Sequence, residues 1–206
     1  MSSYPIRDPK SDHLITPENA ALIIIDYQPV QVNSINSMAR AELINNIVLV
    51  AKLAKGYNLP IILSTVNVGT SLNSDTIPAL RQVLNSTPSY DRTSINAWED
   101  KEFREAVNAT GRKKLLMTAL WTEACLSFPT LDALKEGYEV YPIVDAVGGT
   151  SEIAHKTALE RVSKAGAQLT TIVQLACELQ RDWSRKATAP VMVEALTNIG
   201  AFLKMK

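Results

Sequence analysis

Cys125 is the residue whose type and position point most clearly to chemistry. It follows the apolar run Lys114–Leu120 by a few residues, in LWTEACLSFPTLDAL, where we expect a helix over Cys125–Glu136. A thiol at a helix N-terminus lies near the positive end of the helix dipole and near backbone N–H groups, which favour the thiolate and can hold a developing oxyanion. We therefore predict a nucleophile at Cys125. Burial as a small packing residue is the commoner fate of a free thiol, and it fits Cys177, in VQLACEL, better.

A base must remove the proton of this thiol, and Asp26 is the best candidate. It comes directly after the apolar run ALIII, where a carboxylate is costly unless something requires it. It could instead cap a loop or pair with a buried arginine. The chain has two histidines, His13 in a polar N-terminal arm and His155 on an expected surface helix, so a Cys–His pair is poorly supported.

A cation near the carboxylate and the thiol would keep their charges compatible and orient the pair. The candidates are Arg92, Lys101 and Arg104. We favour Arg92, because it stands in the loop segment SYDRTSINAW, whereas the other two fit the solvated face of a helix. From spacing alone, an ordinary surface pair of Arg92 with Asp91 or Asp100 is at least as plausible.

The elements that must position these residues alternate between apolar runs and stretches of helical period, which is typical of an α/β fold with a buried parallel sheet. The expected strands are Ala20–Asp26, Pro60–Val66, Lys114–Leu120, Tyr138–Val144 and Gln168–Val173. The expected helices are Ile35–Tyr57, Ile77–Asn85, 94–110, Cys125–Glu136, Glu152–Gly166, Ala176–Lys186 and about 190–206. Functional groups gather at the carboxyl ends of strands in such sheets, which is where Asp26 lies and Cys125 follows.

Length and composition favour one domain over residues 1–206, with an N-terminal arm over about 1–18. Lys plus Arg equals Asp plus Glu, 21 each, so we expect a small-molecule partner and neither nucleic acid nor membrane. There is no apolar run long enough to span a bilayer and no signal-peptide core, so we expect a cytoplasmic protein without disulfides. The expected C-terminal helix has one apolar face, which could pack on its own domain or on another subunit.

Three motifs in order along the chain resemble the isochorismatase-like cysteine hydrolases, a family that includes nicotinamidases and N-carbamoylsarcosine amidases. They are ALIIIDYQ, the T-E-A-C segment Thr122–Cys125, and VDAVGGTS. The segments DRTSINAWEDKEF, ALWTEACLSFPTLDALKEGYEVY and ACELQRDW are similar to the YcaC-like branch. The resemblance implies a Rossmann-like three-layer sandwich with a mainly parallel six-stranded sheet. The sixth strand would then lie near Pro88–Arg92 or in the C-terminal region.

The resemblance also implies roles for individual residues. Asp26 would take the thiol proton, and Cys125 would attack a carbonyl or related carbon to form a covalent intermediate that water resolves. Where the family has a lysine, TPSYDRTSINAW offers Arg92, which keeps the charge but cannot donate a proton as lysine can. A non-proline cis peptide at Trp121–Thr122 would aim backbone N–H groups near the thiol into an oxyanion hole, formed by Trp121, Thr122, Ala124 and Cys125.

We expect no metal and no cofactor. Nicotinamidases add a metal site of Asp and His after the second strand, yet TVNVGTSLNSD contains no histidine. The crevice could be lined by Gln28, Asn67, Asn96, Trp98, Trp121 and Phe128, although each of these fits core or loop packing equally well.

The function that the sequence favours is hydrolysis of a C–N bond in a small amide-like molecule through Asp26, Arg92 and Cys125, in a homo-oligomer. A non-catalytic or redox-responsive oligomeric protein, in which Cys125 is oxidised reversibly, is the alternative. A dinucleotide-dependent oxidoreductase is disfavoured, because DYQPVQ stands where a G-x-G-x-x-G turn would follow the first strand.

Overall fold

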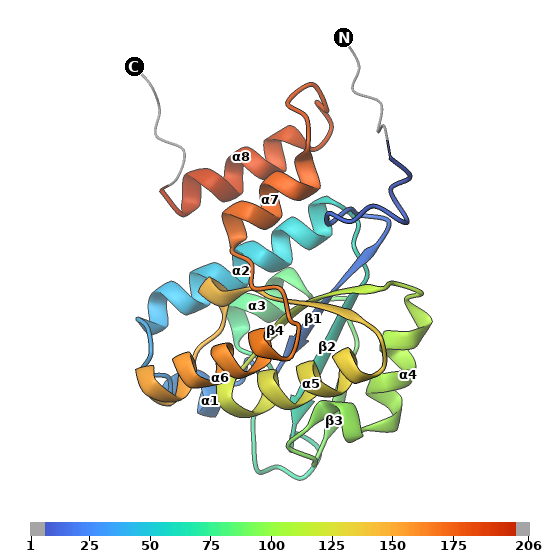
Figure 1. Cartoon of the computed structure of the whole chain (residues 1–206). Helices are drawn as coiled ribbons and strands as arrows, with labels where there is room; N and C mark the ends of the chain where they lie inside the picture. Colours follow the sequence, from blue (N-terminus) through green and yellow to red (C-terminus); the bar gives the residue numbers. More distant parts are fainter. Residues whose placement is uncertain (1–6, 201–206) are drawn as a thin grey trace.

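The computed structural model describes residues 7–200. In it, helices cover both faces of one parallel sheet (Figure 1). The strands are β1 (Ala20–Ile25), β2 (Ile61–Val66), β3 (Ser89–Arg92), β4 (Lys114–Ala119) and β5 (Glu139–Pro142). The α-helices are α1 (Pro29–Asn33), α2 (Arg40–Gly56), α3 (Pro78–Val83), α4 (Lys101–Ala109), α5 (Ser127–Lys135), α6 (Glu152–Lys164), α7 (Ile172–Gln180) and α8 (Ala189–Asn198). Short 3-10 turns, η1 (Ala97–Glu99) and η3 (Val144–Ala146), and one π-helical turn, η2 (Thr122–Leu126), complete the elements of these residues.

The strand order is β3-β2-β1-β4-β5, with every neighbouring pair parallel. The chain builds outward from β1 through β2 to β3, then crosses back to place β4 on the other side of β1. The carboxyl ends of β1 and β4 therefore flank the switch point of the sheet, where crossover helices diverge and leave a crevice. Both Asp26 and the turn that carries Cys125 leave the sheet at this point.

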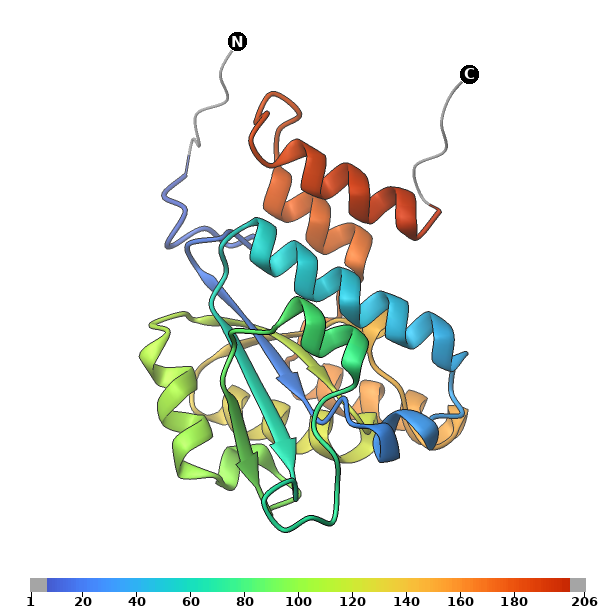
Figure 2. The ribbon, with the colours of Figure 1, turned by 180° about the vertical axis from the view of Figure 1, so that it is seen from behind.

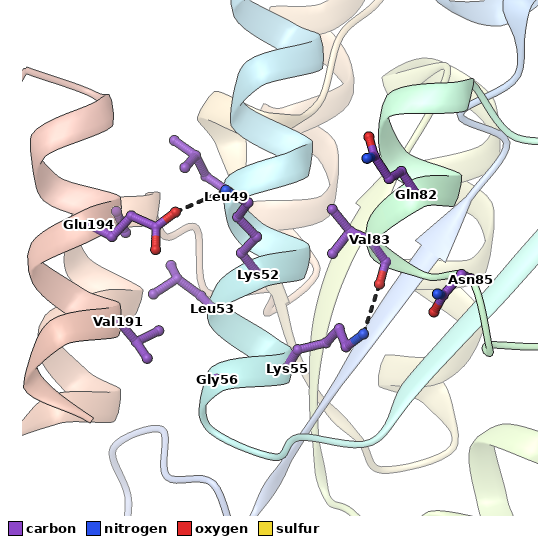
Figure 3. Close-up of a pocket in the computed structure, with 11 residues that line it drawn as sticks. Leu49, Lys52, Leu53, Lys55, Gly56, Gln82, Val83, Asn85, Val191 and Glu194 are labelled. Carbon is purple, nitrogen blue, oxygen red and sulfur yellow. Dashed lines mark hydrogen bonds and ion pairs between the residues drawn. The ribbon is translucent and has the colours of Figure 1, made fainter. Parts of the chain in front are cut away.

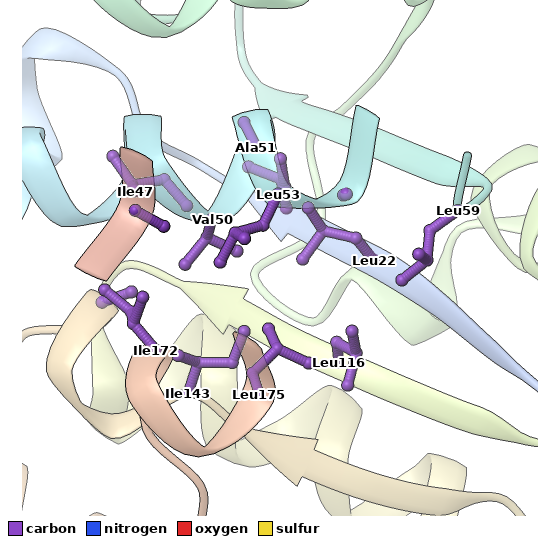
Figure 4. Close-up of a cluster of buried hydrophobic side chains, with 14 of the residues drawn as sticks. Leu22, Ile47, Val50, Ala51, Leu53, Leu59, Leu116, Ile143, Ile172 and Leu175 are labelled. Carbon is purple, nitrogen blue, oxygen red and sulfur yellow. The ribbon is translucent and has the colours of Figure 1, made fainter. Parts of the chain in front are cut away.

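Two apolar clusters fill the spaces between the sheet and its helices. In β1 the residues alternate: Leu22 and Ile24 join the cluster under α2, α3, α7 and α8, whereas Ile23 and Ile25 join the one under α4 and α5. Figure 4 shows the first cluster, with side chains of α2 and α7 meeting over β1 and β4. Burial on both faces explains why β1 reads as an unbroken apolar run, since neither face of the strand reaches water.

The α/β three-layer fold predicted from the sequence is confirmed, with a correction to the strand count. The additional strand sought near Pro88–Arg92 is β3, but the predicted strand Gln168–Val173 is wrong. Thr170 makes a single bridge to Ile143. The chain then enters α7, because the Thr171 side chain and the Asp145 carboxylate accept the first free N–H groups of that helix. The sheet thus has five strands rather than six.

Other boundaries moved for local reasons. The predicted helix over 94–110 begins later, since Asp100 rather than Ser94 caps α4 by accepting from the Phe103 N–H at 2.8 Å. The predicted helix Ile35–Tyr57 is α2, which starts only at Arg40.

The chain ends limit two further predictions. The C-terminal helix is observed as α8, which packs against α2 and α7 and lies at the top of both views (Figures 1 and 2). Its expected continuation over 201–206, and part of the N-terminal arm, lie outside the described residues, so the prediction of one domain over 1–206 stays a prediction.

Candidate active site

Asp26 and Arg92 form a fully buried ion pair at the carboxyl edge of the sheet. Arg92 Nη1 donates to Asp26 Oδ1 and Nη2 to Asp26 Oδ2, both at 2.7 Å, and the two side chains are 1% and 0% exposed. This two-armed geometry is the strongest form of such a pair. The surface pair of Arg92 with Asp91 that the spacing also allowed does not form, because Asp91 instead accepts from the Gly69 and Val68 N–H groups.

The remaining N–H groups of both Arg92 terminal nitrogens are also occupied. Nη1 donates to Ser64 Oγ at 3.1 Å and to the Thr65 carbonyl at 3.0 Å, and Nη2 donates to the Ile95 carbonyl at 3.1 Å. Burial lowers the pKa of Arg92, but the hydrogen bonds and charge of Asp26 more than offset this and leave it raised. The guanidinium is therefore a permanent cation whose terminal donors are committed to protein atoms.

Cys125 lies in the π-helical turn η2 and is 8% exposed. Burial raises the pKa of its thiol, and the charge and hydrogen bonding of Asp26 raise it further, while Arg92 and a backbone hydrogen bond from Trp121 lower it. The expectation that a helix N-terminus would favour the thiolate is thus corrected. Because desolvation and the adjacent carboxylate dominate, the resting thiol is protonated beside an anionic acceptor.

The structure places the non-proline cis peptide at Leu120–Trp121, one bond earlier than predicted. Two of the four N–H groups predicted for an oxyanion hole already have carbonyl partners. Thr122 donates to Gly148 at 2.9 Å, and Ala124 donates to Trp121 at 3.1 Å. Trp121 N–H is directed at the cysteine sulfur. Of the four, this leaves the N–H of Cys125 itself as the candidate donor to a reacting oxygen.

Two of the predicted substrate-binding residues anchor the loop after β2. Gln28 is fully buried; its amide donates to the carbonyls of Val66 and Ser74 and accepts from the Val66 N–H at 2.9 Å. Asn67 begins this loop with a φ of 61° and accepts from the Thr70 hydroxyl. Both polar atoms of the Gln28 side chain and the side-chain oxygen of Asn67 are therefore engaged in loop structure.

Asn96 and Trp98 belong to the packing under α4 and α5. Asn96 accepts from the Trp98 N–H at 3.0 Å and donates to Asp132 at 2.7 Å, which ties η1 to α5. The Trp98 ring packs edge-on against Phe103 and Tyr138. These contacts fit a packing role for Asn96 and Trp98, the alternative to substrate binding that the sequence left open.

Trp121 and Phe128 flank the cysteine turn on its two sides. The Trp121 indole donates to Ser34 Oγ at 2.6 Å and packs against the cluster under α2. Phe128 is half-buried, one residue into α5. Their roles in substrate binding stay predictions.

Several residues near the site were missed from the sequence. Ser64 and Thr65 are polar residues inside the buried run of β2, and this break in the run was the available signal for the Arg92 partners. Glu123 belongs to the turn of Cys125 and binds Thr150, and His155 contacts the same turn from α6. His155 Nδ1 and Thr122 Oγ1 share a hydrogen bond of 2.9 Å, although the histidine is 33 residues away from the threonine in sequence.

Cys177 corrects a second expectation, since it is exposed on α7 rather than buried as packing. Within residues 7–200, no group of three or more His, Cys, Asp or Glu side chains could hold a metal ion. None of the helices described is both long and apolar enough to cross a bilayer.

A cavity of about 420 Å³ lies between α2, α3 and α8 (Figure 3). Gly56, at the end of α2 and just before β2, lines it, so the cavity lies towards the amino edge of the sheet. It includes none of the predicted site residues, and its two lysines are engaged: Lys52 with Glu194, and Lys55 with the Val83 carbonyl. The cavity is therefore separate from the chemistry at Cys125.

Comparison with known proteins places this arrangement in context. Residues 20–174 match the family described as Isochorismatase domain. The chain is 39% identical over 166 residues to a protein from Escherichia coli (strain K12) named "Probable hydrolase YcaC", covering 80% of this chain and 79% of the relative.

Two solved structures are similar along almost the whole chain. The YcaC gene product from Escherichia coli, described as an octameric hydrolase of unknown specificity, superposes with a TM-score of 0.85 at 35% identity, covering 92% of each chain. YcaC from Pseudomonas aeruginosa, with hexane-2,5-diol and covalent acrylamide, superposes with a TM-score of 0.81 at 30% identity, covering 96% of this chain and 100% of the other.

Proposed function

Since the chain belongs to the isochorismatase family of hydrolases, we propose that it hydrolyses a C–N bond of a small amide-like molecule through a covalent intermediate on Cys125. One observation carries the proposal: the Asp26 carboxylate lies against the Cys125 thiol and is held there by two hydrogen bonds from Arg92. A buried thiol beside a fixed carboxylate is an arrangement of nucleophile, base and orienting group.

In the first step, the Cys125 sulfur attacks the carbonyl carbon as the S–H proton passes to Asp26. The new C–S bond converts the carbonyl oxygen into an oxyanion, for which the Cys125 N–H is the candidate donor. Asp26 then gives its proton to the leaving nitrogen as the C–N bond breaks, which leaves a thioester. Water attacks the thioester as Asp26 accepts a proton from it, and the C–S bond then breaks as Asp26 returns that proton to the sulfur, which restores the free thiol and the carboxylate.

Arg92 acts in this scheme as a positioning residue. Its terminal N–H groups all have protein partners, and its Nε–H, which has no hydrogen-bond partner, is buried, so the guanidinium presents no accessible donor to a substrate oxygen. What the guanidinium supplies is a fixed carboxylate and a positive charge that stays in place while the proton moves. Polarisation of the carbonyl then falls to the backbone of the cysteine turn.

A redox-responsive role for Cys125 is the weaker alternative. Redox-sensing cysteines combine a low thiol pKa with solvent access. Here burial and Asp26 raise the pKa of the thiol, and the residue is 8% exposed. A buried thiol with a raised pKa is compatible with the hydrolase proposal, because Asp26 can accept the proton that burial keeps on the sulfur.

The Pseudomonas relative carries covalent acrylamide, and this small amide is the probe for the test. Acrylamide adducts are counted by peptide mass spectrometry at pH 7 in the native chain, Cys125→Ser and Asp26→Asn, with exposed Cys177 as the internal reference. We expect the adduct to form faster at Cys125 than at Cys177, and we expect only the Cys177 adduct in Cys125→Ser. A panel of small amides, followed by release of amine, extends the test to turnover.

Asp26→Asn separates two roles of the carboxylate. Its negative charge raises the thiol pKa and Arg92 lowers it, so removing the charge alone favours the thiolate. A purely electrostatic role therefore predicts faster labelling in Asp26→Asn. A base predicts slower labelling, by about 10² or more. Faster labelling, or a Cys125 no more reactive than Cys177, overturns the proposal.

The assembly is proposed from the same relatives. The Escherichia coli YcaC structure is octameric, and we expect this chain to form a homo-oligomer, which light scattering after size-exclusion chromatography tests. The small-molecule substrate and the cytoplasmic location stay predictions.

A further inference from the structure

The turn that carries Cys125 is fastened from behind to the segment between β5 and α6. Glu123 Oε1 accepts from the Thr150 N–H at 3.0 Å and from the Thr150 hydroxyl at 2.6 Å. Thr122 donates its N–H to the Gly148 carbonyl at 2.9 Å. The first two residues of the turn are therefore tied to Gly148 and Thr150, two residues of a segment that is distant in sequence.

A second contact reaches the turn from α6. Thr122 Oγ1 and His155 Nδ1 share a hydrogen bond of 2.9 Å, with the donor set by the imidazole tautomer. Thr122 is fully buried, and Ser127 closes the other end of the turn by donating its hydroxyl to the Thr122 carbonyl at 2.8 Å. His155 thus holds Thr122, the first residue of the turn, through its side-chain hydroxyl.

Gly149 shows how closely these parts approach. A Cβ at this position would lie 2.6 Å from Glu123 Oε2 and 3.0 Å from His155 Cβ. Any side chain here would force the carboxylate and the helix apart. The second Glu123 oxygen is buried against this backbone without a hydrogen-bond partner, which is unusual for a carboxylate oxygen and shows how tightly the side chain is enclosed here.

We propose that Glu123 and His155 are positioning residues, which act through Thr122 and Thr150 to hold the Cys125 turn against Asp26. The inference rests on the proposed function for the reaction that it serves. Neither side chain touches the substrate in this scheme. Their effect is on where the sulfur and the Cys125 N–H point, and a displacement of about 1 Å in such a geometry can cost 10² in rate.

The test compares matched variants that keep or remove each hydrogen bond. Thr122→Ser keeps the hydroxyl and Thr122→Val removes it at nearly constant volume. His155→Asn keeps a polar group near the Nδ1 position and His155→Phe removes it. Glu123→Gln keeps an acceptor for Thr150 and Glu123→Ala removes it. Ser163→Ala, at the exposed far end of α6, is the control for that helix.

The readout is the acrylamide adduct rate at Cys125 divided by that at Cys177, which cancels differences in probe and concentration. We expect Thr122→Val, His155→Phe and Glu123→Ala to lower this ratio about tenfold or more, and each conservative partner to recover most of it. Circular dichroism checks that every variant is folded. A ratio that stays within twofold of the native value in all three variants that remove a hydrogen bond overturns the proposal.

Hydrogen exchange at the amides of 122–126 keeps this inference separable from the proposed function. If the native Cys125 is no more reactive than Cys177, the hydrolase proposal fails. Faster exchange confined to this turn in Thr122→Val and His155→Phe would still support the proposal that these contacts hold the turn in place. Unchanged exchange in both variants counts against the proposal that these contacts hold the turn, whatever the reactivity of the thiol.

Discussion

The sheet holds a buried cation at each of its two edges, and the two are built differently. At the carboxyl edge, Arg92 pairs with Asp26, and both side chains are out of reach of water. At the amino edge, Lys114 begins β4 with its side chain 3% exposed, but its partner Glu139 is 47% exposed, and Tyr141 supplies a second contact at 3.2 Å. The Arg92–Asp26 pair is sealed, meaning that both side chains are buried, while in the open Lys114–Glu139 pair the glutamate reaches solvent.

The difference shows what each pair can be used for. A carboxylate in water is solvated whether or not its partner is present, so Glu139 loses little if Lys114 goes. Asp26 is fully buried, so its carboxylate is hydrogen-bonded to Arg92 where an exposed carboxylate would be solvated by water. Burying both partners is an expensive way to add stability, but it keeps a carboxylate charged and fixed in an apolar interior, which is what a base beside a thiol requires.

Arg92→Met tests the sealed pair most severely. It leaves the Asp26 charge buried without a partner, and we expect it to lower the free energy of unfolding by about 3–5 kcal/mol. Urea denaturation followed by fluorescence measures the change. Arg104→Met, which breaks the exposed pair with Glu136, is the matched control and should change stability by less than about 1 kcal/mol. Equal losses in the two variants would contradict the comparison.

Arg92→Lys keeps the charge but replaces the fork by a single nitrogen. One arm of the Asp26 pair and some of the contacts to Ser64, Thr65 and Ile95 are lost. We expect a loss of roughly 1.5–3 kcal/mol, the range for a hydrogen bond to a charged group. The same denaturation series measures it, and a loss as large as that of Arg92→Met would mean that the fork itself, rather than the charge, holds Asp26.

Lys114→Met is the corresponding change at the open edge. The methionine fills the space of the lysine stem, and Glu139 stays solvated, so we expect a change of less than about 1 kcal/mol, in either direction. Thermal and urea unfolding of this variant beside Arg92→Met give the comparison directly. A loss of several kcal/mol would show that the amino-edge pair is sealed in solution as well.

The smallest expected effect is a dependence on pH at the open edge. Burial lowers the pKa of Lys114, but its hydrogen bonds to Glu139 and Tyr141 outweigh this and leave it raised. A raised lysine pKa stabilises the folded state below the unfolded pKa, about 10.4, and this stabilisation is lost as pH rises through the folded value. The difference in unfolding free energy between the native chain and Lys114→Met should therefore fall by a few tenths of a kcal/mol or more between pH 8 and pH 11.5; a difference that grows over this range contradicts the assignment.

The features of this structure that depend on short-range sequence pattern could be predicted from the sequence. The apolar run of β1 and the carboxylate at its end placed Asp26 correctly, because a charge after such a run is costly wherever the chain folds. Arg92 was harder: spacing favoured a surface pair equally, and only the order of β3 beside β2 brings it to Asp26. Such an approach between distant segments leaves no local pattern.

Residue type likewise left the roles of two predicted binding residues open between binding and packing. Asn96 and Gln28 have the side chains of a binding site, but their amides cap η1 and anchor the loop after β2. Glu123 stands in the T-E-A-C segment but was given no role, and His155, far away in sequence, was not linked to the cysteine turn, although the Gly-Gly pair at 148–149 was a sign of a close backbone approach there. Burial of Cys125 by the helices around it, finally, outweighs the helix-end effect that its position indicates.

The place of β1 in the sheet also bears on how the chain is made. This wholly apolar strand pairs with β2 on one side and β4 on the other, yet β4 starts only at Lys114. On the ribosome, β1 and β2 emerge long before β4, and during that interval the second edge of β1 has no partner from its own chain. An unpaired apolar edge invites pairing with another molecule. Synthesis that stalls before Lys114 should therefore yield aggregating fragments, whereas release after β4 closes the edge.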